Sequence, residues 1–134
     1  YTEETASLLF DHHIDFIVDA SDTISYKIHL IKECLKRNIK FISSMGAANK
    51  LDPTKIVVTD IYKTHTCPLA KVLRRELKDR RIKKLKVVYS TEQPRELKER
   101  IMNGRKVTPG SVSFVPSVGG LTIASIVVRE LLER

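Results

Sequence analysis

The chain has 134 residues, of which 42% are hydrophobic and 30% charged, and it carries a formal net charge of +8 at pH 7. This composition is typical of one globular domain and excludes a disordered segment. Cys34 and Cys67 lie far apart in the sequence, which excludes a disulfide framework and a Cys-x-x-Cys zinc site and indicates a reducing, cytoplasmic setting.

Residues 2–10 are predicted to form a short helix, because acidic residues fall in its first turn, where the helix dipole favours them. A loop with the adjacent histidines His12 and His13 follows. Adjacent histidines can bind metal, but no partner at helical spacing accompanies this pair, so we predict a solvated loop.

A strand–helix–strand unit is predicted next. Residues 14–20 form an apolar run bounded by polar residues, which indicates a buried strand. Residues 24–37 form a helix, whose apolar face carries Ile24, Ile28, Ile31 and Leu35. Asn38 suits a left-handed helix stop, and residues 40–44 form a second buried strand. Such a unit is typical of two parallel strands joined by a crossover helix.

The middle of the chain contains a loop of small residues and a second set of elements. The loop, residues 45–50, could let a ligand approach the backbone or simply make a turn. Residues 56–61 are predicted to form a strand. Pro68 suits the first position of an amphipathic helix, and residues 85–89 form a further strand.

The stretch from Lys71 to Lys86 holds nine basic residues against Glu76 and Asp79, a local net charge of +7. It therefore carries most of the basic surplus of the chain. A nucleic-acid surface and an ordinary solvated helix face are equally compatible with this pattern.

Residues 91–110 lack periodicity and contain at most a short helix over residues 96–102. A loop of this length is usually functional or disordered. Residues 111–115 are predicted to form a short strand.

The final helix is expected over residues 121–133, opened by Gly119 and Gly120, which allow close packing or the close approach of a ligand. Its first two turns are apolar nearly all round, which predicts a buried helix. The most apolar stretch, residues 121–128, is shorter than the ~20 residues that a membrane span needs. We therefore expect no transmembrane segment.

Together these elements predict an α/β fold with an at least partly parallel sheet. Asp22 follows the first buried strand, and open α/β sheets bind ligands at the carboxyl ends of their strands. Asp22 is therefore the first candidate for chemistry, with the loop of residues 45–50 beside it. Because no Gly-x-Gly-x-x-Gly or Gly-Lys-Ser/Thr segment occurs, these residues alone do not make a complete dinucleotide or P-loop site.

The two cysteines differ in their expected environment. Cys34 lies beside Ile31 on the predicted helix and is expected in the core. Cys67 stands at a helix start near Lys63, and both features could activate a thiol. A buried, inert thiol is nevertheless the favoured interpretation.

Several segments, in order, resemble the ThiF/MoeB/HesA superfamily of ubiquitin-activating-type adenylating enzymes. They are VDASDT at 18–23, SMGAANKLDPT at 44–54, DIYKT at 60–64 before PLA at 68–70, VYSTE at 88–92 and VPSVGGL at 115–121. As an ordered set they resemble one branch closely, the tRNA threonylcarbamoyladenosine dehydratases (TcdA or CsdL). The resemblance implies a Rossmann-like α/β fold with a mixed sheet and flanking helices.

The resemblance also implies an activity for the intact enzyme. ATP and Mg²⁺ would activate the carboxylate of threonylcarbamoyladenosine in tRNA, so that this side chain closes into a cyclic form with net loss of water. The carboxylate attacks the α-phosphate, and the resulting acyl-adenylate is a good electrophile. The protein supplies positioning and charge neutralisation. The implied partners are tRNA, a second copy of the protein and sulfur-transfer proteins.

By the same resemblance, Asp22 is the catalytic candidate near the Mg²⁺-bound phosphates, and Thr23 lies at the nucleotide edge. Lys27 matches a basic family position and is assigned to the cofactor site, although its role could be structural.

The family's glycine-rich loop, ribose-binding acid and phosphate-binding arginine and lysine precede this segment. Residues 1–134 are therefore expected to be the C-terminal part of a ThiF-type adenylating domain without its nucleotide-binding half. Alone, this part is expected neither to bind ATP measurably nor to be active, and to associate with itself through an uncovered strand face.

Two other interpretations stay open. One is a MoeB/ThiF-type adenylyltransferase that activates a ubiquitin-like sulfur carrier, although the two Cys-x-x-Cys pairs usual in those relatives are missing. The other is a non-catalytic nucleic-acid-binding module built on the basic stretch. Under the dehydratase interpretation, five basic residues are expected to hold tRNA phosphates: Arg74, Arg75, Lys78, Arg80 and Arg81.

Overall fold

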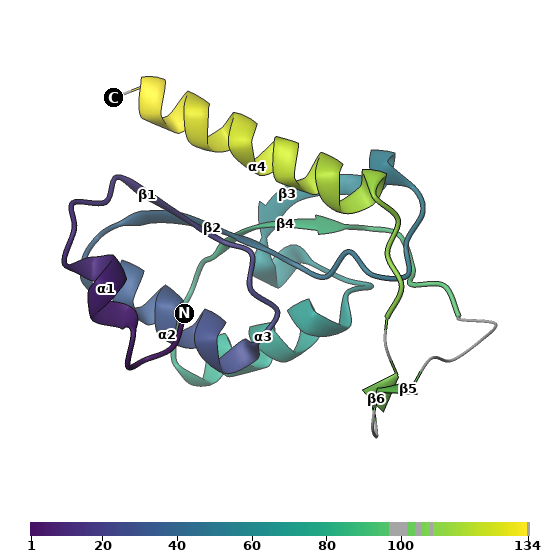
Figure 1. The fold of residues 1–134 in the computed structure, drawn as a ribbon, viewed down its shortest axis with the longest axis horizontal. Coiled ribbons are helices and arrows are strands. Elements are labelled where there is room, and N and C mark those ends of the chain that lie inside the picture. Colours follow the sequence, from purple (N-terminus) through teal and green to yellow (C-terminus); the bar gives the residue numbers. More distant parts are fainter. Residues whose placement is uncertain (97–101, 104–105, 108, 134) are drawn as a thin grey trace.

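The computed structural model describes residues 1–96, 102–103, 106–107 and 109–133. A four-stranded sheet lies between two layers of helices, with α4 on one face and α2 and α3 on the other (Figure 1). This is an α/β fold with a mixed sheet and flanking helices, as the sequence predicts.

The sheet has the strand order β1-β2-β4-β3. Its strands are β1 (Phe16–Asp19), β2 (Lys40–Ser44), β3 (Ile56–Asp60) and β4 (Lys86–Ser90). β1, β2 and β4 run parallel, and β3 is antiparallel to β4. A separate hairpin pairs β5 (Met102–Asn103) with β6 (Lys106–Val107). The predicted parallel crossover from β1 to β2 is confirmed, because Asp19 lies opposite Ser43 in a parallel register.

The helices are α1 (Ala6–Phe10), α2 (Ile24–Lys36), α3 (Pro68–Asp79) and α4 (Phe114–Leu132), with short 3₁₀ turns η1 (Pro53–Lys55) and η2 (Ile61–Lys63). α2 and α3 begin where they were predicted, and Asn38 stops α2 with a φ of 54°. Leu35, expected on the buried face, is 48% exposed, and the neighbouring Cys34 fills the core instead.

α1 begins later than predicted because Thr2 and Thr5 form a turn before it, in which the Thr2 amide donates to Thr5 Oγ1 at 2.8 Å. The predicted short helix over residues 96–102 lies largely outside the described residues.

The predictions for α4 were wrong at its start. Residues 111–115 do not form a strand, and the helix begins at Phe114, seven residues before the predicted position. Pro116 is tolerated because it falls in the first turn, where its missing N–H has no intrahelical partner to lose. The helix is also less buried than expected, since Leu121 is 71% exposed.

The length of α4 also corrects the predicted extent of its apolar stretch. Its 19 residues have a mean hydropathy of 1.5, so the helix could span a membrane by length and composition alone. A single helix of this kind is weak evidence, because core helices have the same composition. Its inner side packs on the sheet through Ile123 and Ile126, which contact Ile42 and Val88.

The larger core cluster lies on the opposite face, between the sheet and α2 and α3. Ile31, Leu73 and Leu77 of these helices and Val87 of β4 have no exposed surface. Full burial of such a side chain contributes about 1.5–3 kcal/mol each, so this cluster is the main source of hydrophobic stability.

Asn49 connects the loop after β2 with two distant segments. Its amide donates to the Gly110 carbonyl at 2.7 Å, and its carbonyl accepts from the Arg95 amide at 2.7 Å. Its side-chain Oδ1 accepts from the Gly110 amide at 3.0 Å. Asn49 has a φ of 59°, which asparagine tolerates better than most residues.

Candidate functional site

The candidate site lies at the edge of the sheet where the three parallel strands end. β1 is followed by residues 20–23, β2 by the loop of small residues, and β4 ends at Ser90. Because the strands run in the same direction, these three ends lie at one edge, the position at which open α/β sheets bind ligands.

A cavity of about 470 Å³ opens at this edge. The connection from β1 to α2, the loop after β2 and the first half of α4 contribute small residues to its wall: Ser21, Gly46, Ala47, Ala48, Gly119 and Gly120. Three segments that lie far apart in the sequence thus meet at one cavity. Asp22 is the one charged side chain among the described residues of its wall.

Asp22 is exposed to solvent at this cavity. Thr23 Oγ1 lies 3.4 Å from Asp22 Oδ1, a long hydrogen bond that leaves most of the carboxylate free to accept other ligands. Thr23 is exposed beside it and begins α2 as its N-cap residue, without a side-chain capping bond.

The surroundings of Lys27 do not favour its predicted assignment to the cofactor site. Its side chain has no exposed surface, and its ammonium donates to Asp19 Oδ2, to Ser43 Oγ and to the Ser44 carbonyl at 2.8–3.0 Å. All three N–H donors of the ammonium are used by the protein. In this conformation Lys27 therefore has no exposed surface and no free N–H donor to offer a nucleotide.

The hub of this buried network, Asp19, was not among the predicted site residues. Its carboxylate accepts from the Ser21 amide at 3.0 Å and from Ser21 Oγ at 2.8 Å, besides Lys27 and Ser43. A signal was present in the sequence, because Lys27 lies on the same helix face as Ile24, Ile28 and Ile31. A lysine on an apolar face needs a buried partner.

A second buried lysine ends the loop of small residues. Lys50 is 1% exposed, and its ammonium donates to the Ser90 carbonyl at 2.9 Å. Burial lowers the pKa of Lys50, against an opposing effect of Cys67 and Glu92. Lys50 belongs to the predicted loop of residues 45–50, but its burial was not predicted.

Cys67 is buried, as the favoured interpretation predicted, and it packs beside Gly46 of the loop after β2. Its Sγ lies 3.7 Å from the position that a Cβ on Gly46 would occupy. The His65 ring packs edge-on against Tyr89, with centroids 5.8 Å apart. Cys34 is likewise buried in the core, as predicted.

The basic stretch does not act as one uniform surface. Arg74 is half-buried, and its guanidinium donates to the Thr64 carbonyl at 2.8 Å and to Thr64 Oγ1. Arg80 pairs with Glu76 at 2.8 Å. Arg75, Lys78 and Arg81 are exposed. Arg74 Nη1 is thus engaged with Thr64, which makes Arg74 a weaker candidate for phosphate binding than the three exposed residues.

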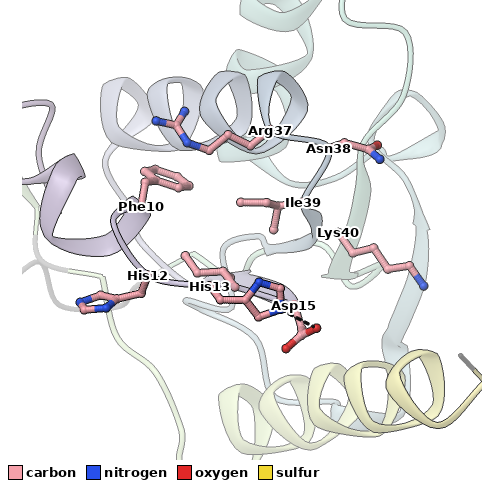
Figure 2. A pocket seen from close by; sticks show the side chains of 9 residues that line it. Phe10, His12, His13, Asp15, Arg37, Asn38, Ile39 and Lys40 are labelled. Carbon is pink, nitrogen blue, oxygen red and sulfur yellow. Dashed lines mark ion pairs between the residues drawn. The ribbon is translucent and has the colours of Figure 1, made fainter.

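Another cavity, of about 430 Å³, opens at the opposite edge of the sheet, where β1 and β2 begin (Figure 2). His12 and His13 lie in its wall, exposed as predicted, and His13 pairs with Asp15 at 3.5 Å. Arg37 lies 4.5 Å above the Phe10 ring. The C-terminal end of α2 also faces this region, and its partial negative charge disfavours phosphate. This cavity contains none of the predicted site residues.

Comparisons with known proteins agree with the arrangement of the motifs, although no family model matches the chain. The chain is 50% identical, over 99% of its length, to a tRNA threonylcarbamoyladenosine dehydratase of Bacillus subtilis. Over 66% of its length it is 46% identical to tRNA threonylcarbamoyladenosine dehydratase 2 of Saccharomyces cerevisiae.

Solved structures show the same relationship in the fold. The E. coli tRNA N6-threonylcarbamoyladenosine dehydratase TcdA in complex with ATP superposes on 97% of the chain with a TM-score of 0.81 and 25% identity. Its complex with AMP gives a TM-score of 0.79 and 26% identity. The chain spans 57% of the Bacillus relative and 53% of each of these E. coli chains. In sequence and in fold, the chain is thus a homologue of about half of a tRNA threonylcarbamoyladenosine dehydratase, which confirms the resemblance that its motifs indicate.

Proposed function

We propose that this chain is the C-terminal part of an ATP-dependent tRNA threonylcarbamoyladenosine dehydratase, and that Asp22 faces the phosphates of ATP in the intact enzyme. The observation that carries this proposal is the meeting of three motif segments at one cavity. Residues 20–22, 44–48, 115–116 and 119–120 line it at the carboxyl edge of the parallel strands. The names of the relatives supply the reaction, and ATP is bound in one of the solved relatives.

The residues at the cavity fit a magnesium ion that arrives with the nucleotide. Mg²⁺ commonly keeps several waters and binds through one or two carboxylates together with substrate phosphates. Asp22 offers one exposed carboxylate, and the described residues contain no group of three or more His, Cys, Asp or Glu side chains that could hold a metal by themselves. Asp22 would thus complete the coordination of a phosphate-bound Mg²⁺ ion.

The charge of the cavity also supports the proposal that a second part of the protein contributes to it. No lysine or arginine occurs among the described residues of its wall. A triphosphate needs positive charge in its site. We therefore expect calorimetric titration of residues 1–134 with Mg²⁺-ATP to give no measurable heat of binding. Micromolar affinity would contradict the proposed division of the site.

The catalytic assignment is tested in the full-length protein by replacing Asp22 with Asn. We expect cyclisation of threonylcarbamoyladenosine in tRNA to fall on the order of 100-fold, the loss typical of removing one group that helps to stabilise charge in the transition state. Asp11→Asn, which removes an exposed carboxylate outside the cavity, is the matched control. Unchanged activity of Asp22→Asn would exclude a catalytic role for this residue.

The sulfur-carrier interpretation makes a different prediction for the same protein. A sulfur-carrier tail would then stimulate ATP–pyrophosphate exchange, while tRNA would not. The dehydratase proposal predicts dependence on modified tRNA.

The exposed basic residues of α3 and the turn after it are the proposed contact with tRNA phosphates. Arg75, Lys78 and Arg81 project into solvent and have no bidentate carboxylate partner among the described residues. Removing one phosphate-binding side chain should reduce the slope of log affinity against log salt by roughly 0.7–0.9. Changing these three residues to Glu should therefore weaken tRNA binding and flatten its salt dependence.

The matched control for this experiment reverses three exposed lysines elsewhere: Lys32, Lys36 and Lys40. Both triple variants change the net charge equally. If the two variants lose affinity equally, the effect comes from the overall charge and not from a defined contact on α3.

A further inference from the structure

Lys27 connects three elements from the first turns of α2. Its ammonium donates to Asp19 at the end of β1, at 2.8 Å, and to Ser43 Oγ and the Ser44 carbonyl near the end of β2, at 3.0 and 2.9 Å. These acceptors come from the two parallel strands whose following loops line the cavity. One buried cation therefore fixes the relative positions of both strand ends.

Asp19 transmits this connection to the segment that carries Asp22. One oxygen of its carboxylate accepts from Lys27 and from Ser43, and the other accepts from the amide and the hydroxyl of Ser21. Ser21 precedes Asp22 directly. The Asp22 segment is thus held through one residue to a carboxylate that is itself held by Lys27.

Burial limits what this arrangement can contribute to stability. Lys27 has no exposed surface and Asp19 is 2% exposed. Desolvation lowers the pKa of Lys27, and the charges of Asp19 and Asp22 oppose that effect. A buried ion pair commonly stabilises a fold no better than apolar residues of the same volume would. Its defined hydrogen-bond geometry, in contrast, fixes the groups that it joins.

We propose that the Lys27–Asp19 ion pair is a positioning device that sets the location of Asp22 relative to the loop after β2. Lys27 acts through Asp19 and Ser21 and touches no substrate. The inference rests on the proposed function, because it assigns Lys27 a role in the reaction of Asp22. A displacement of about 1 Å at a reacting group can lower a rate on the order of 100-fold.

The test needs a variant that removes the device and still folds. Lys27→Met alone leaves Asp19 buried without its ion partner, and we expect this variant to be strongly destabilised. The double variant Asp19→Asn with Lys27→Met removes both charges together and leaves Ser21 a neutral side-chain oxygen, which is a weaker acceptor than the carboxylate. Lys32→Met, on the exposed side of α2, is the control.

The first measurement is amide hydrogen exchange in the full-length protein. The Ser21 amide donates to Asp19, and the Met45 amide donates to the Val88 carbonyl at 2.9 Å. In the double variant we expect both amides to exchange about tenfold faster, while the amide of Leu73 in α3 keeps its rate. Unchanged exchange at Ser21 and Met45 in a folded double variant would overturn the proposal.

The second measurement is the cyclisation rate at saturating ATP, taken in the parent protein and in the Asp22→Asn background. If Lys27 acts through Asp22, the double variant should lose on the order of 100-fold when Asp22 is present. In the Asp22→Asn background the same double change should cause no further loss, because the group that it positions is already gone. Equal losses in both backgrounds would show a general structural role and overturn the proposal.

Failure of the proposed function gives a different pattern. In that case the parent protein shows no ATP-dependent cyclisation, or Asp22→Asn leaves the rate unchanged. Amide exchange then decides by itself whether Lys27 holds the Asp22 segment in place.

Discussion

The two faces of the sheet differ in how completely they are covered. On the side of α2 and α3, Leu73, Leu77 and Ile31 have no exposed surface. On the side of α4, Val18 of β1 is 46% exposed, and Leu121 and Leu132 of the helix are exposed by more than two thirds. α3 carries polar residues on its outer side, whereas α4 is apolar nearly all round, a pattern typical of a helix inside a larger structure. Among the described residues, one face of the sheet is thus closely covered, and the other is only partly covered.

The largest expected effect is a difference in stability between two leucine-to-alanine variants, one on each side of the sheet. Leu73→Ala should lower the free energy of unfolding by about 2–5 kcal/mol, because it leaves a cavity in a closed core. Leu121→Ala should change it by less than about 0.5 kcal/mol, because the side chain is mostly in water. Urea unfolding of the two variants measures the contrast. Similar losses would mean that α4 is covered in solution.

The second prediction concerns what covers α4 when the chain is alone. We expect the chain to associate with itself, since its exposed leucines and valines gain free energy on leaving water. Light scattering should then give an average mass above that of one chain. Leu121→Lys with Val128→Lys should shift it toward the monomer, because both side chains are exposed on α4.

Val72→Lys is the control for this prediction, since Val72 is 40% exposed on α3. It should leave association unchanged. A clean monomer of the parent chain at high concentration would contradict the expectation.

The smallest expected effect is a pH dependence of the free energy of unfolding, caused by a buried thiol on the side of α2 and α3. Burial raises the pKa of Cys34 to about 12, from an ordinary value of 9.0. As the pH rises, the thiol therefore ionises at a lower pH in the unfolded chain than in the folded one. This ionisation stabilises the unfolded state and lowers the free energy of unfolding. Above pH 9 the free energy of unfolding should fall by up to about 1.4 kcal/mol per pH unit from this thiol.

Cys34→Ala should remove that slope while lowering stability at pH 7. Unfolding of the parent and the variant at pH 7 and pH 10 measures it. Equal slopes in the two proteins would show that Cys34 ionises as readily in the folded chain.

The parts of the fold that could be predicted are those set by interactions between residues close together in the sequence. α2 and α3 follow from apolar periodicity and from the stop and start residues Asn38 and Pro68. The start of α4 was missed because Pro116 and the two glycines resemble a helix break, although proline is acceptable in a first turn.

The candidate site was predictable only in part. The position of Asp22 follows from its place after a buried strand. The hydrogen bond from Ser43 to Asp19 joins residues 24 positions apart, and the register that brings them together is a property of the assembled sheet. The charged group on an apolar helix face was visible in the sequence, but its partner was not. The same holds for Arg74, whose bond to Thr64 depends on how α3 packs against η2.

Asn49 has a consequence for engineering the chain. It binds Arg95 on one side and Gly110 on the other, so both ends of the intervening stretch are fixed at a single residue. A substitution at Asn49 would therefore release both attachments together, and any redesign of the neighbouring cavity should keep this asparagine in place.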